Sequence, residues 1–349
     1  LNNTGGILLK FGLEINNLVY FNQKSENIEI TMKNILSWKD FYLNWDGGPE
    51  YIMVKKERLW IPDLELYNSA SKPKLYDKSP LVKLYRDGEV EYVRVISYSF
   101  SCKLALDEFP FDTQTCNMLF GSWKYSKKNL DIRPFGVSDH FSNFSVSPLF
   151  SHNEWNIAEI DVLHEDYEYK CCPGELWPNS KYILKLKRNP HKYNLLIIMA
   201  VFITISSLFI NYIDISIYYR TYILVFIPLT LIWLQIHTSS KIPVISYSTK
   251  LERIISTCFL TTMFALFESG ILYSIIGNHF VFLSDYIEIN SKNKGEMGKH
   301  IDGTEIILKP TTKTNLDYPY VKYIFYKLDI LYSIILTSVF IITILIIIL

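Results

Sequence analysis

Apolar and polar positions follow two different patterns along the chain. Up to about residue 190 they alternate over short segments such as 28–32 and 89–93, and an Asp87-Gly88 pair typical of hairpin turns precedes the second segment. Alternation places every second side chain on one face of a strand. This part of the chain therefore predicts a β-sandwich.

The remainder of the chain contains four long apolar runs, at residues 193–213, 221–240, 254–276 and 330–349. Each run is close to the roughly 20 residues that a helix needs to cross a bilayer, and Glu268 is the one charged side chain within them, with histidine counted as neutral. A soluble core seldom needs four helices that are apolar all round. We therefore expect spans one to three within 191–277, a loop at 278–322 and a fourth span within 323–349.

Composition and charge exclude several classes of protein. The 35 basic side chains balance the 35 acidic ones, which argues against a nucleic-acid partner, and 49% hydrophobic residues argue against disorder. The seven histidines are scattered, and the loop before the fourth span has no Gly-rich phosphate-binding sequence or metal-ligand cluster. We expect neither an enzyme nor a cofactor or metal site.

Cysteines and glycosylation motifs predict that the first part of the chain lies outside the cell. Four of the five cysteines precede the first apolar run, as expected for a domain with disulfides, and Asn2 and Asn143 begin glycosylation motifs. Four crossings would then place both termini outside and the 278–322 loop in the cytosol. The lysines of that loop are matched by acids, so the positive-inside rule adds little support.

Cys102 and Cys116 enclose 13 residues, with Phe109-Pro110-Phe111-Asp112 near the middle. Closing a loop of this size is worth about 3 kcal/mol in the entropic account of disulfides. The adjacent Cys171 and Cys172 leave the pairing open, because four cysteines permit three connectivities. A bond between these two neighbours would close a small, strained ring.

This cysteine loop, together with the four following apolar runs, resembles the Cys-loop pentameric ligand-gated channels. The sequence Tyr169-Lys170-Cys171-Cys172 resembles the adjacent cysteines of nicotinic acetylcholine receptor α-type subunits. Further similar segments lie at 38–45, 60–63, 66–68, 121–125 and 153–155, so the resemblance covers nearly the whole chain. It implies an immunoglobulin-like sandwich of about ten strands at 1–190 that binds neurotransmitter, a four-helix bundle, and disulfides Cys102–Cys116 and Cys171–Cys172.

The resemblance also assigns a ligand site, formed by the cysteine pair and an aromatic cage of Tyr67, Trp123, Tyr169 and Trp177. A quaternary ammonium such as acetylcholine has no N–H donor, so ring faces are well suited to hold it. The family usually has tyrosine where Trp177 stands, so the ring is kept and the hydroxyl is lost. Trp38, Trp45 and Trp60 are instead expected in the core of the sandwich.

Lys33 stands where the family commonly has an aromatic residue on the second, complementary face of the site. A cation facing a cationic ligand is unfavourable. We therefore expect a hetero-pentamer in which another subunit supplies this face. The alternative is that Lys33 points to solvent.

The resemblance assigns coupling between ligand and pore to Arg188 and to the cysteine-loop residues Phe109, Pro110, Phe111 and Asp112. Arg188 is alternatively a cation at the membrane edge. In the family, the tyrosine before the adjacent cysteines often interacts with a lysine and an aspartate. Residues 119 and 179 are leucine and asparagine here, so that charge network is absent.

The second span should line the pore, with Leu229 as the hydrophobic gate and Thr230 as a pore-facing hydroxyl. Pro228 departs from the family pattern, and aligning on 238–240 instead shifts the register. Arg220 would form a positive ring at the inner mouth unless acids offset it, and Asp214 is the nearest acid in the sequence.

We therefore expect a subunit of an acetylcholine-gated, cation-selective channel in the postsynaptic plasma membrane. Its expected partners are the transmitter, other receptor subunits, membrane lipid and permeant ions. One alternative is a non-conducting or assembly subunit of such a receptor. Another is an anion-selective, amine-gated channel, which Arg220 would permit.

Overall fold

The computed structural model describes residues 6–76, 81–136, 139, 141–212, 217–297 and 318–348. The chain divides into two compact units, described separately below. The β unit comprises residues 1–190 together with Lys241–Tyr247, and the helical unit comprises His191–Ser240 and Ser248–Leu349. The segment 241–247 therefore belongs to the β unit although helices flank it on both sides.

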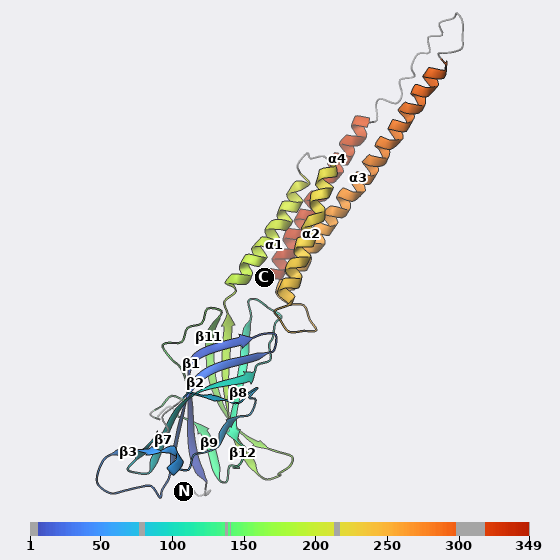
Figure 1. The fold of residues 1–349 in the computed structure, drawn as a ribbon. Coiled ribbons are helices and arrows are strands. Elements are labelled where there is room, and N and C mark those ends of the chain that lie inside the picture. Colours follow the sequence, from blue (N-terminus) through green and yellow to red (C-terminus); the bar gives the residue numbers. More distant parts are fainter. Residues whose placement is uncertain are drawn as a thin grey trace, which may run out of the picture. The chain divides into compact units, whose positions relative to one another are not determined.

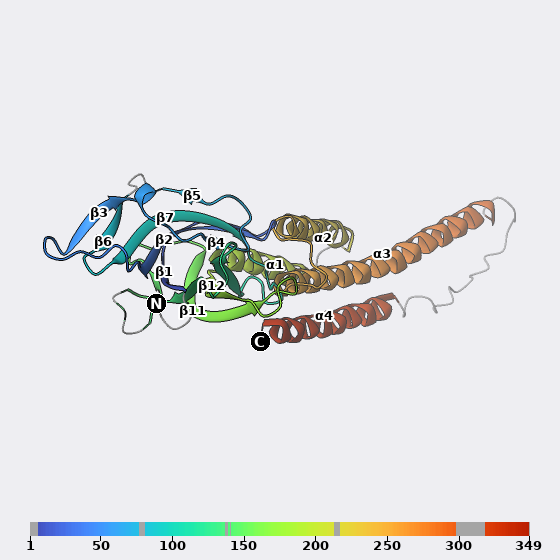
Figure 2. The ribbon, with the colours of Figure 1, turned by 90° about the horizontal axis from the view of Figure 1, so that it is seen from below.

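Two sheets form the β unit (Figures 1 and 2), as the alternating pattern predicts. The described strands are β1 Ile7–Asn22, β2 Asn27–Lys39, β3 Tyr51–Lys55, β4 Leu64–Leu66, β5 Lys74–Leu75, β6 Leu81–Tyr85, β7 Glu89–Ser101, β8 Thr113–Ser122, β9 Leu130–Pro134, β10 Phe144–Val146, β11 Trp155–Glu168 and β12 Leu176–Arg188. One sheet has the order β10-β1-β2-β7-β6-β3, with β5 pairing β7 and β9 pairing β1. The other sheet has the order β11-β12-β8-β4.

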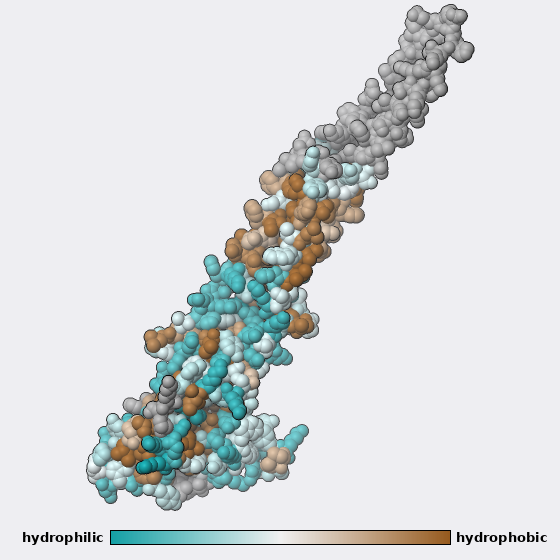
Figure 3. Space-filling view, in the orientation of Figure 1, coloured by the Kyte–Doolittle hydropathy of each residue, from teal (hydrophilic) through white to brown (hydrophobic). Residues whose placement is uncertain are grey.

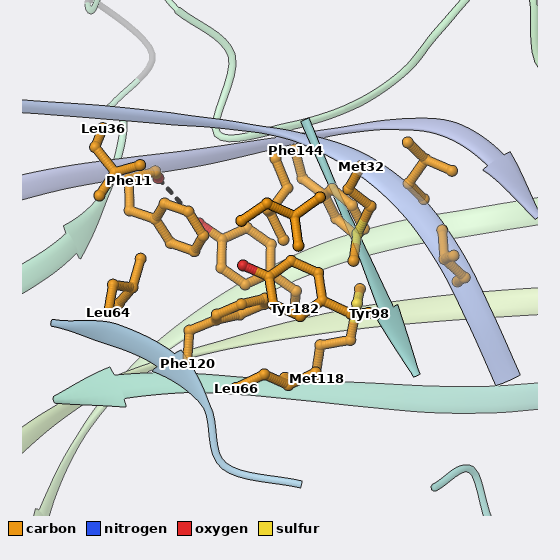
Figure 4. Packing of buried hydrophobic residues seen from close by; sticks show 14 of the residues in the cluster. Phe11, Met32, Leu36, Leu64, Leu66, Tyr98, Met118, Phe120, Phe144 and Tyr182 are labelled. Carbon is orange, nitrogen blue, oxygen red and sulfur yellow. Dashed lines mark hydrogen bonds between the residues drawn. The ribbon is translucent and has the colours of Figure 1, made fainter. Parts of the chain in front are cut away.

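Aromatic rings from both sheets meet in the core. Phe11 on β1 makes edge contacts with Phe120 on β8 and Tyr182 on β12, with ring centroids 5.0 and 5.3 Å away. The Tyr182 hydroxyl donates a hydrogen bond of 2.9 Å to the Phe11 carbonyl oxygen (Figure 4). Burial raises the pKa of Tyr182 well above its usual value, so the hydroxyl remains a donor. This bond satisfies the one polar group of a ring that otherwise packs among hydrophobic side chains.

The Cys102–Cys116 disulfide joins the two sheets. Cys102 follows β7 of the larger sheet and Cys116 lies within β8 of the smaller one, and the two sulfur atoms are bonded at 2.02 Å. The structure thereby decides between the connectivities that the sequence left open. The bond closes the 103–115 loop between the two sheets.

Two of the three tryptophans expected in the core are at least partly buried. Trp38 on β2 is buried, and Trp45 is half-buried against the core. Trp60 is 37% exposed, so the prediction of a core position for it is wrong. It follows a short helical turn and packs edge-on against Trp38 and Tyr125 at the margin of the sheets.

Four helices make up the described part of the helical unit, and α3 packs against each of the others (Figure 2). They are α1 His191–Ile210, α2 Ile217–Ser239, α3 Lys250–Met297 and α4 Tyr318–Ile348. Each contains a segment long and apolar enough to cross a membrane, and hydrophobic residues dominate their outer surface (Figure 3). The expected β-sandwich followed by four helices is confirmed.

Helix α3 does not end where its apolar run ends. The run stops at residue 276, whereas the helix continues to Met297 through a more polar sequence. The loop expected at 278–322 is therefore helical over its first part, and α4 begins at Tyr318. Hydropathy marks where a chain can leave a bilayer, but a polar helix can continue beyond that point.

Removing the inter-sheet disulfide should destabilise the β unit. For Cys102→Ala/Cys116→Ala in the full chain, we expect the free energy of unfolding to fall by about 3 kcal/mol, because the unfolded chain regains the freedom of an open loop. A guanidinium titration followed by tryptophan fluorescence measures the change. Cys171→Ser/Cys172→Ser is the matched control, and an equal loss there would show that the loop closure is not responsible.

Candidate functional site

Three chain segments bring the four predicted cage aromatics to one place in the β unit. Tyr67 follows β4, Trp123 follows β8, and Tyr169 and Trp177 flank the turn between β11 and β12. The Tyr67 and Trp123 rings have centroids 4.3 Å apart, and those of Tyr169 and Trp177 are 6.1 Å apart. The Tyr67 hydroxyl and the side chain of Asn179, two residues after Trp177 on β12, both lie beside Gly121, which connects the two pairs of rings.

Trp123 offers most of its ring to the outside. Its side chain is 60% exposed, although a tryptophan placed only for packing would be expected to hide its ring. The turn that carries it is held by Asp63, which accepts a 2.6 Å hydrogen bond from the Ser122 hydroxyl and a 3.1 Å bond from the Lys124 backbone N–H. The exposed ring is therefore mounted on an ordered turn.

Tyr67 is fixed more deeply than Trp123. Its hydroxyl donates a 2.7 Å hydrogen bond to the Ser122 carbonyl oxygen, and burial raises its pKa well above the usual value, with Tyr169 and Asp63 adding to the effect. Gly121 makes this position possible, because a Cβ atom there would overlap the Tyr67 ring and hydroxyl. The glycine of the 121–125 segment therefore leaves the space that the Tyr67 side chain occupies.

The turn from Tyr169 to Trp177 is ordered by its own hydrogen bonds. The Cys172 N–H donates to the Tyr169 carbonyl oxygen at 3.0 Å, and the Gly174 N–H donates to a Glu168 carboxylate oxygen at 2.7 Å. Gly174 has a φ of +80°, a conformation that favours glycine. Trp177 Nε1 is buried and has no hydrogen-bond partner among the described residues.

Cys171 and Cys172 are free thiols in this structure, so the bond expected between them is not formed. Their sulfur atoms lie 2.7 Å apart, beyond the roughly 2.05 Å of a disulfide. The hydrogen bond between the two groups raises the pKa of the Cys172 thiol. A bridge from either thiol to the cysteine loop is excluded, because Cys102 and Cys116 are bonded to each other.

Three further residues near the cage were not predicted. Tyr167 is 53% exposed, and its ring centroid is 4.8 Å from that of Tyr169. The two-residue spacing of these tyrosines, which places both side chains on one face of a strand, could have predicted that their rings lie together. Asp63 and Glu65 act electrostatically on Tyr67, so acidic groups lie close to the rings. Such an environment favours a cationic guest.

Lys33 on β2 neither faces a ligand as a lone charge nor points freely to solvent. Its ammonium lies 3.2 Å from the carboxylate of Glu14, the residue directly opposite on β1. The pair is partly exposed, so it contributes little to stability. It nevertheless offsets the charge from which we predicted repulsion of a cationic ligand.

Arg188 at the end of β12 is buried in the β unit, so its interpretation as a membrane-edge cation is wrong. Its guanidinium donates to both carboxylate oxygens of Asp112, at 2.7 and 3.1 Å, and to Glu154 at 2.8 Å. The same group lies 4.8 Å above the ring of Phe109 and 4.2 Å above that of Trp155. The predicted residues Arg188, Phe109 and Asp112 thus meet in one cluster.

The cysteine loop is tied to its surroundings on either side of that cluster. Gln114 donates to Asp112 and exchanges two hydrogen bonds with the backbone of Ala105. The Leu106 N–H donates a 3.0 Å bond to the hydroxyl oxygen of Tyr247, in the segment that joins α2 to α3. Of the two remaining predicted residues, Pro110 is buried and Phe111 is 45% exposed.

Residues 119 and 179 carry no charge, in keeping with the sequence expectation. The Asn179 side chain is buried, and its Oδ1 has no hydrogen-bond partner among the described residues. Leu119 instead offers its backbone N–H to Asn68 Oδ1 at 3.2 Å. The side chains at positions 119 and 179 therefore form no ion pair with each other.

Leu229 and Thr230 are both exposed on α2. The Thr230 hydroxyl donates a 2.7 Å bond to the Ile227 carbonyl oxygen, beside Pro228 within the helix. Arg220 is different, because it is buried and its guanidinium lies 2.7 Å from the carboxylate of Asp329 on α4. The sequence pointed to Asp214, which lies outside the described residues.

One cluster of possible metal ligands was not anticipated. Asp131 on β9 and His164 and Asp166 on β11 present ligand atoms within 4.8 Å of one another. Lys127 already pairs with Asp166, and Arg133 pairs with Asp131 at 2.8 Å. These two cations offset the carboxylates, so we assign no ion to the cluster.

The second glycosylation motif has a suitable setting. Asn143 is exposed just before β10. Its Oδ1 accepts a 2.7 Å hydrogen bond from the next backbone N–H. Asn2 lies outside the described residues.

Comparison with known proteins identifies the family. A sequence model of the neurotransmitter-gated ion-channel ligand-binding domain matches residues 1–190, which form most of the β unit. The chain belongs to the neurotransmitter-gated ion-channel family. Four candidate membrane spans follow this domain, so the chain is a multi-pass membrane protein.

The similar proteins of this family include neuronal acetylcholine receptor subunits. The chain is 29% identical to subunit alpha-3 of Homo sapiens over 211 residues, which cover 59% of the chain and 41% of that protein. It is 31% identical to subunit alpha-4 of Mus musculus over 212 residues, covering 59% and 33% respectively. The matched part spans less than half of these relatives. They are receptor subunits, in agreement with the prediction that the chain is not an enzyme.

Gly121→Ala should disturb the proposed cage without replacing any of its rings. The added methyl group overlaps Tyr67, so we expect a loss of about 1–3 kcal/mol in the free energy of unfolding. Chemical denaturation of the full chain measures it. Gly136→Ala is the control, since the nearest atom to its Cβ is 3.5 Å away. Equal losses in both variants would contradict the steric explanation.

Asp112→Asn should destabilise the β unit far more than Glu154→Gln. The first change leaves the buried Arg188 guanidinium without its bidentate carboxylate, at a cost of about 3–5 kcal/mol. Glu154 is 42% exposed, so its loss should cost below about 1 kcal/mol. Denaturation of the two variants side by side tests this order. A larger effect of Glu154→Gln would overturn it.

Proposed function

We propose that this chain is a subunit of a pentameric, cation-selective channel of the plasma membrane that acetylcholine or a related amine opens. The observation that supports this most strongly is the pair of ring contacts, Tyr67 with Trp123 and Tyr169 with Trp177, to which three separate segments of the β unit contribute. Its named relatives are acetylcholine receptor subunits. The proposal includes ligand binding at a subunit interface, with these rings on the principal face.

Ring faces and nearby acids together suit a quaternary ammonium. Each ring contributes up to about 2 kcal/mol to a desolvated cation, so two to four contacts approach the roughly 8 kcal/mol of micromolar binding. Asp63 and Glu65 add negative potential without being required for direct contact. The exposed face of Trp123 is the most open of the rings that could receive the cation.

Oxidation of Cys171 and Cys172 is part of the proposal. Their sulfur atoms are already adjacent at 2.7 Å, and extracellular conditions favour disulfides. A bond between them would stiffen the turn that carries Tyr169 and Trp177. This turn would then close over the ligand as one piece.

Coupling to the pore is proposed to run through the Arg188 cluster. Arg188 ends the strand that begins beside the cage with Trp177, and it is held by Asp112 of the cysteine loop. The same loop contacts Tyr247 in the 241–247 segment, which joins α2 to α3. Hydrogen bonds through Asp112 and Gln114 to Ala105, followed by the peptide bond to Leu106, therefore give movement of β12 a path to the connection between two helices.

Other receptor subunits are proposed to complete the site. The argument from charge repulsion at Lys33 is weakened, because Glu14 pairs with this side chain. The position still lacks an aromatic ring, which a complementary face would need. A hetero-pentamer with ring-bearing partner subunits follows from this missing ring. A postsynaptic location and extracellular termini complete the proposal.

Trp123 substitutions test the cage. With the full chain expressed alongside candidate partner subunits, we expect Trp123→Ala to raise the Kd of a radiolabelled quaternary ammonium ligand about 30-fold, from the loss of about 2 kcal/mol. Trp123→Phe should raise it less, because a smaller ring remains.

Trp60→Phe is the matched control, since Trp60 is also an exposed tryptophan but contacts Trp38 and Tyr125 instead of the cage. Its Kd should equal that of the unchanged chain. Unchanged affinity in both Trp123 variants, with normal surface expression, would refute the proposed site.

A further inference from the structure

The buried arginine of the helical unit has a role that the aromatic site does not explain. Arg220 lies near the start of α2 and is only 3% exposed. Its guanidinium lies 2.7 Å from Asp329 on α4 and 4.0 Å from Glu268 on α3. A charge buried between membrane-spanning helices is costly unless it is paired, so this arrangement calls for an explanation.

The periodicity of α2 places Arg220 on the face that packs inside the subunit. Leu224, Leu231, Leu234 and Thr238 are all buried, and their spacing from Arg220 returns to the same face of a helix. Leu229 is nine residues from Arg220, which corresponds to a rotation of about 180° at 3.6 residues per turn. Leu229 is 56% exposed, on the opposite side of the helix.

The carboxyl groups around Arg220 outnumber its single positive charge, so they are not equivalent partners of the guanidinium. Two carboxyl groups face one guanidinium, and both have side chains that are no more than 13% exposed. Asp329 makes the short contact, whereas Glu268 lies at the limit of an ion pair. Asp329 is therefore the principal partner of Arg220.

We propose that Arg220, Asp329 and Glu268 form an ionic lock inside each subunit, which joins α2 to α3 and α4 and withdraws the Arg220 charge from the conduction path. The consequence for selectivity rests on the proposed channel function. If Leu229 lines the pore, Arg220 faces away from it, and no ring of five guanidinium groups selects anions. The lock itself does not depend on ligand or conduction.

A double-mutant cycle on surface expression tests the lock in the full chain. We expect Asp329→Asn to lower the amount at the cell surface several-fold, because it leaves a buried guanidinium without its main partner. Combining it with Arg220→Met should restore most of the loss, since no unpaired cation remains. Glu268→Gln should lower expression less than Asp329→Asn.

Arg253→Met, which removes an exposed arginine from α3, is the matched control and should not rescue Asp329→Asn. Additive losses from Arg220→Met and Asp329→Asn would overturn the lock. This readout needs no agonist, so failed ligand binding and a failed lock remain distinguishable.

Reversal potentials test the consequence for selectivity. Channels carrying Arg220→Met/Asp329→Asn should show the same response to chloride replacement as unchanged channels. A reversal potential that follows chloride in the unchanged channel and stops following it in the double variant would overturn the withdrawal of the Arg220 charge from the pore. The surface-expression cycle decides the lock on its own in cells that give no current.

Discussion

A guanidinium group removed from water must find a carboxylate, and each unit contains one such buried group among the residues that the structure describes. In the β unit, Arg188 is fully buried and held by Asp112 and Glu154. In the helical unit, Arg220 is held by Asp329, with Glu268 further away. Because an unpaired buried charge is expensive, each arginine restricts which segments can pack around it. This constraint acts where β12 ends at Arg188 and where α2, α3 and α4 pack around Arg220.

The aromatic side chains show the opposite arrangement in core and site. Phe11, Phe120 and Tyr182 pack edge to face between the sheets, where their burial stabilises the sandwich. Tyr67 and Trp123 contact each other outside that core, and Trp123 leaves most of its ring exposed. The same residue type therefore stabilises the fold in one place and remains available for a cation in another, and the difference lies in where each strand ends.

The two functions proposed for the β unit share one strand. Strand β12 carries Trp177 of the proposed cage near its start and ends with the buried Arg188. A change at one end can reach the other through the backbone of a single, paired strand. The 241–247 segment extends this path, because it belongs to the β unit and accepts a hydrogen bond from the cysteine loop through Tyr247.

The sequence determined the features that depend on local pattern. Alternation located the strands and apolar runs located the four helices, whereas the family resemblance of ordered motifs singled out the four aromatics of the proposed cage. Tertiary structure decided what depends on partners distant in the chain. Examples are the pairing of Arg220 with Asp329, the ion pair of Lys33 with Glu14, the exposure of Trp60 and the continuation of α3 to Met297. Local patterns report which face of a segment is apolar, whereas the partner of a charge depends on which segments pack together.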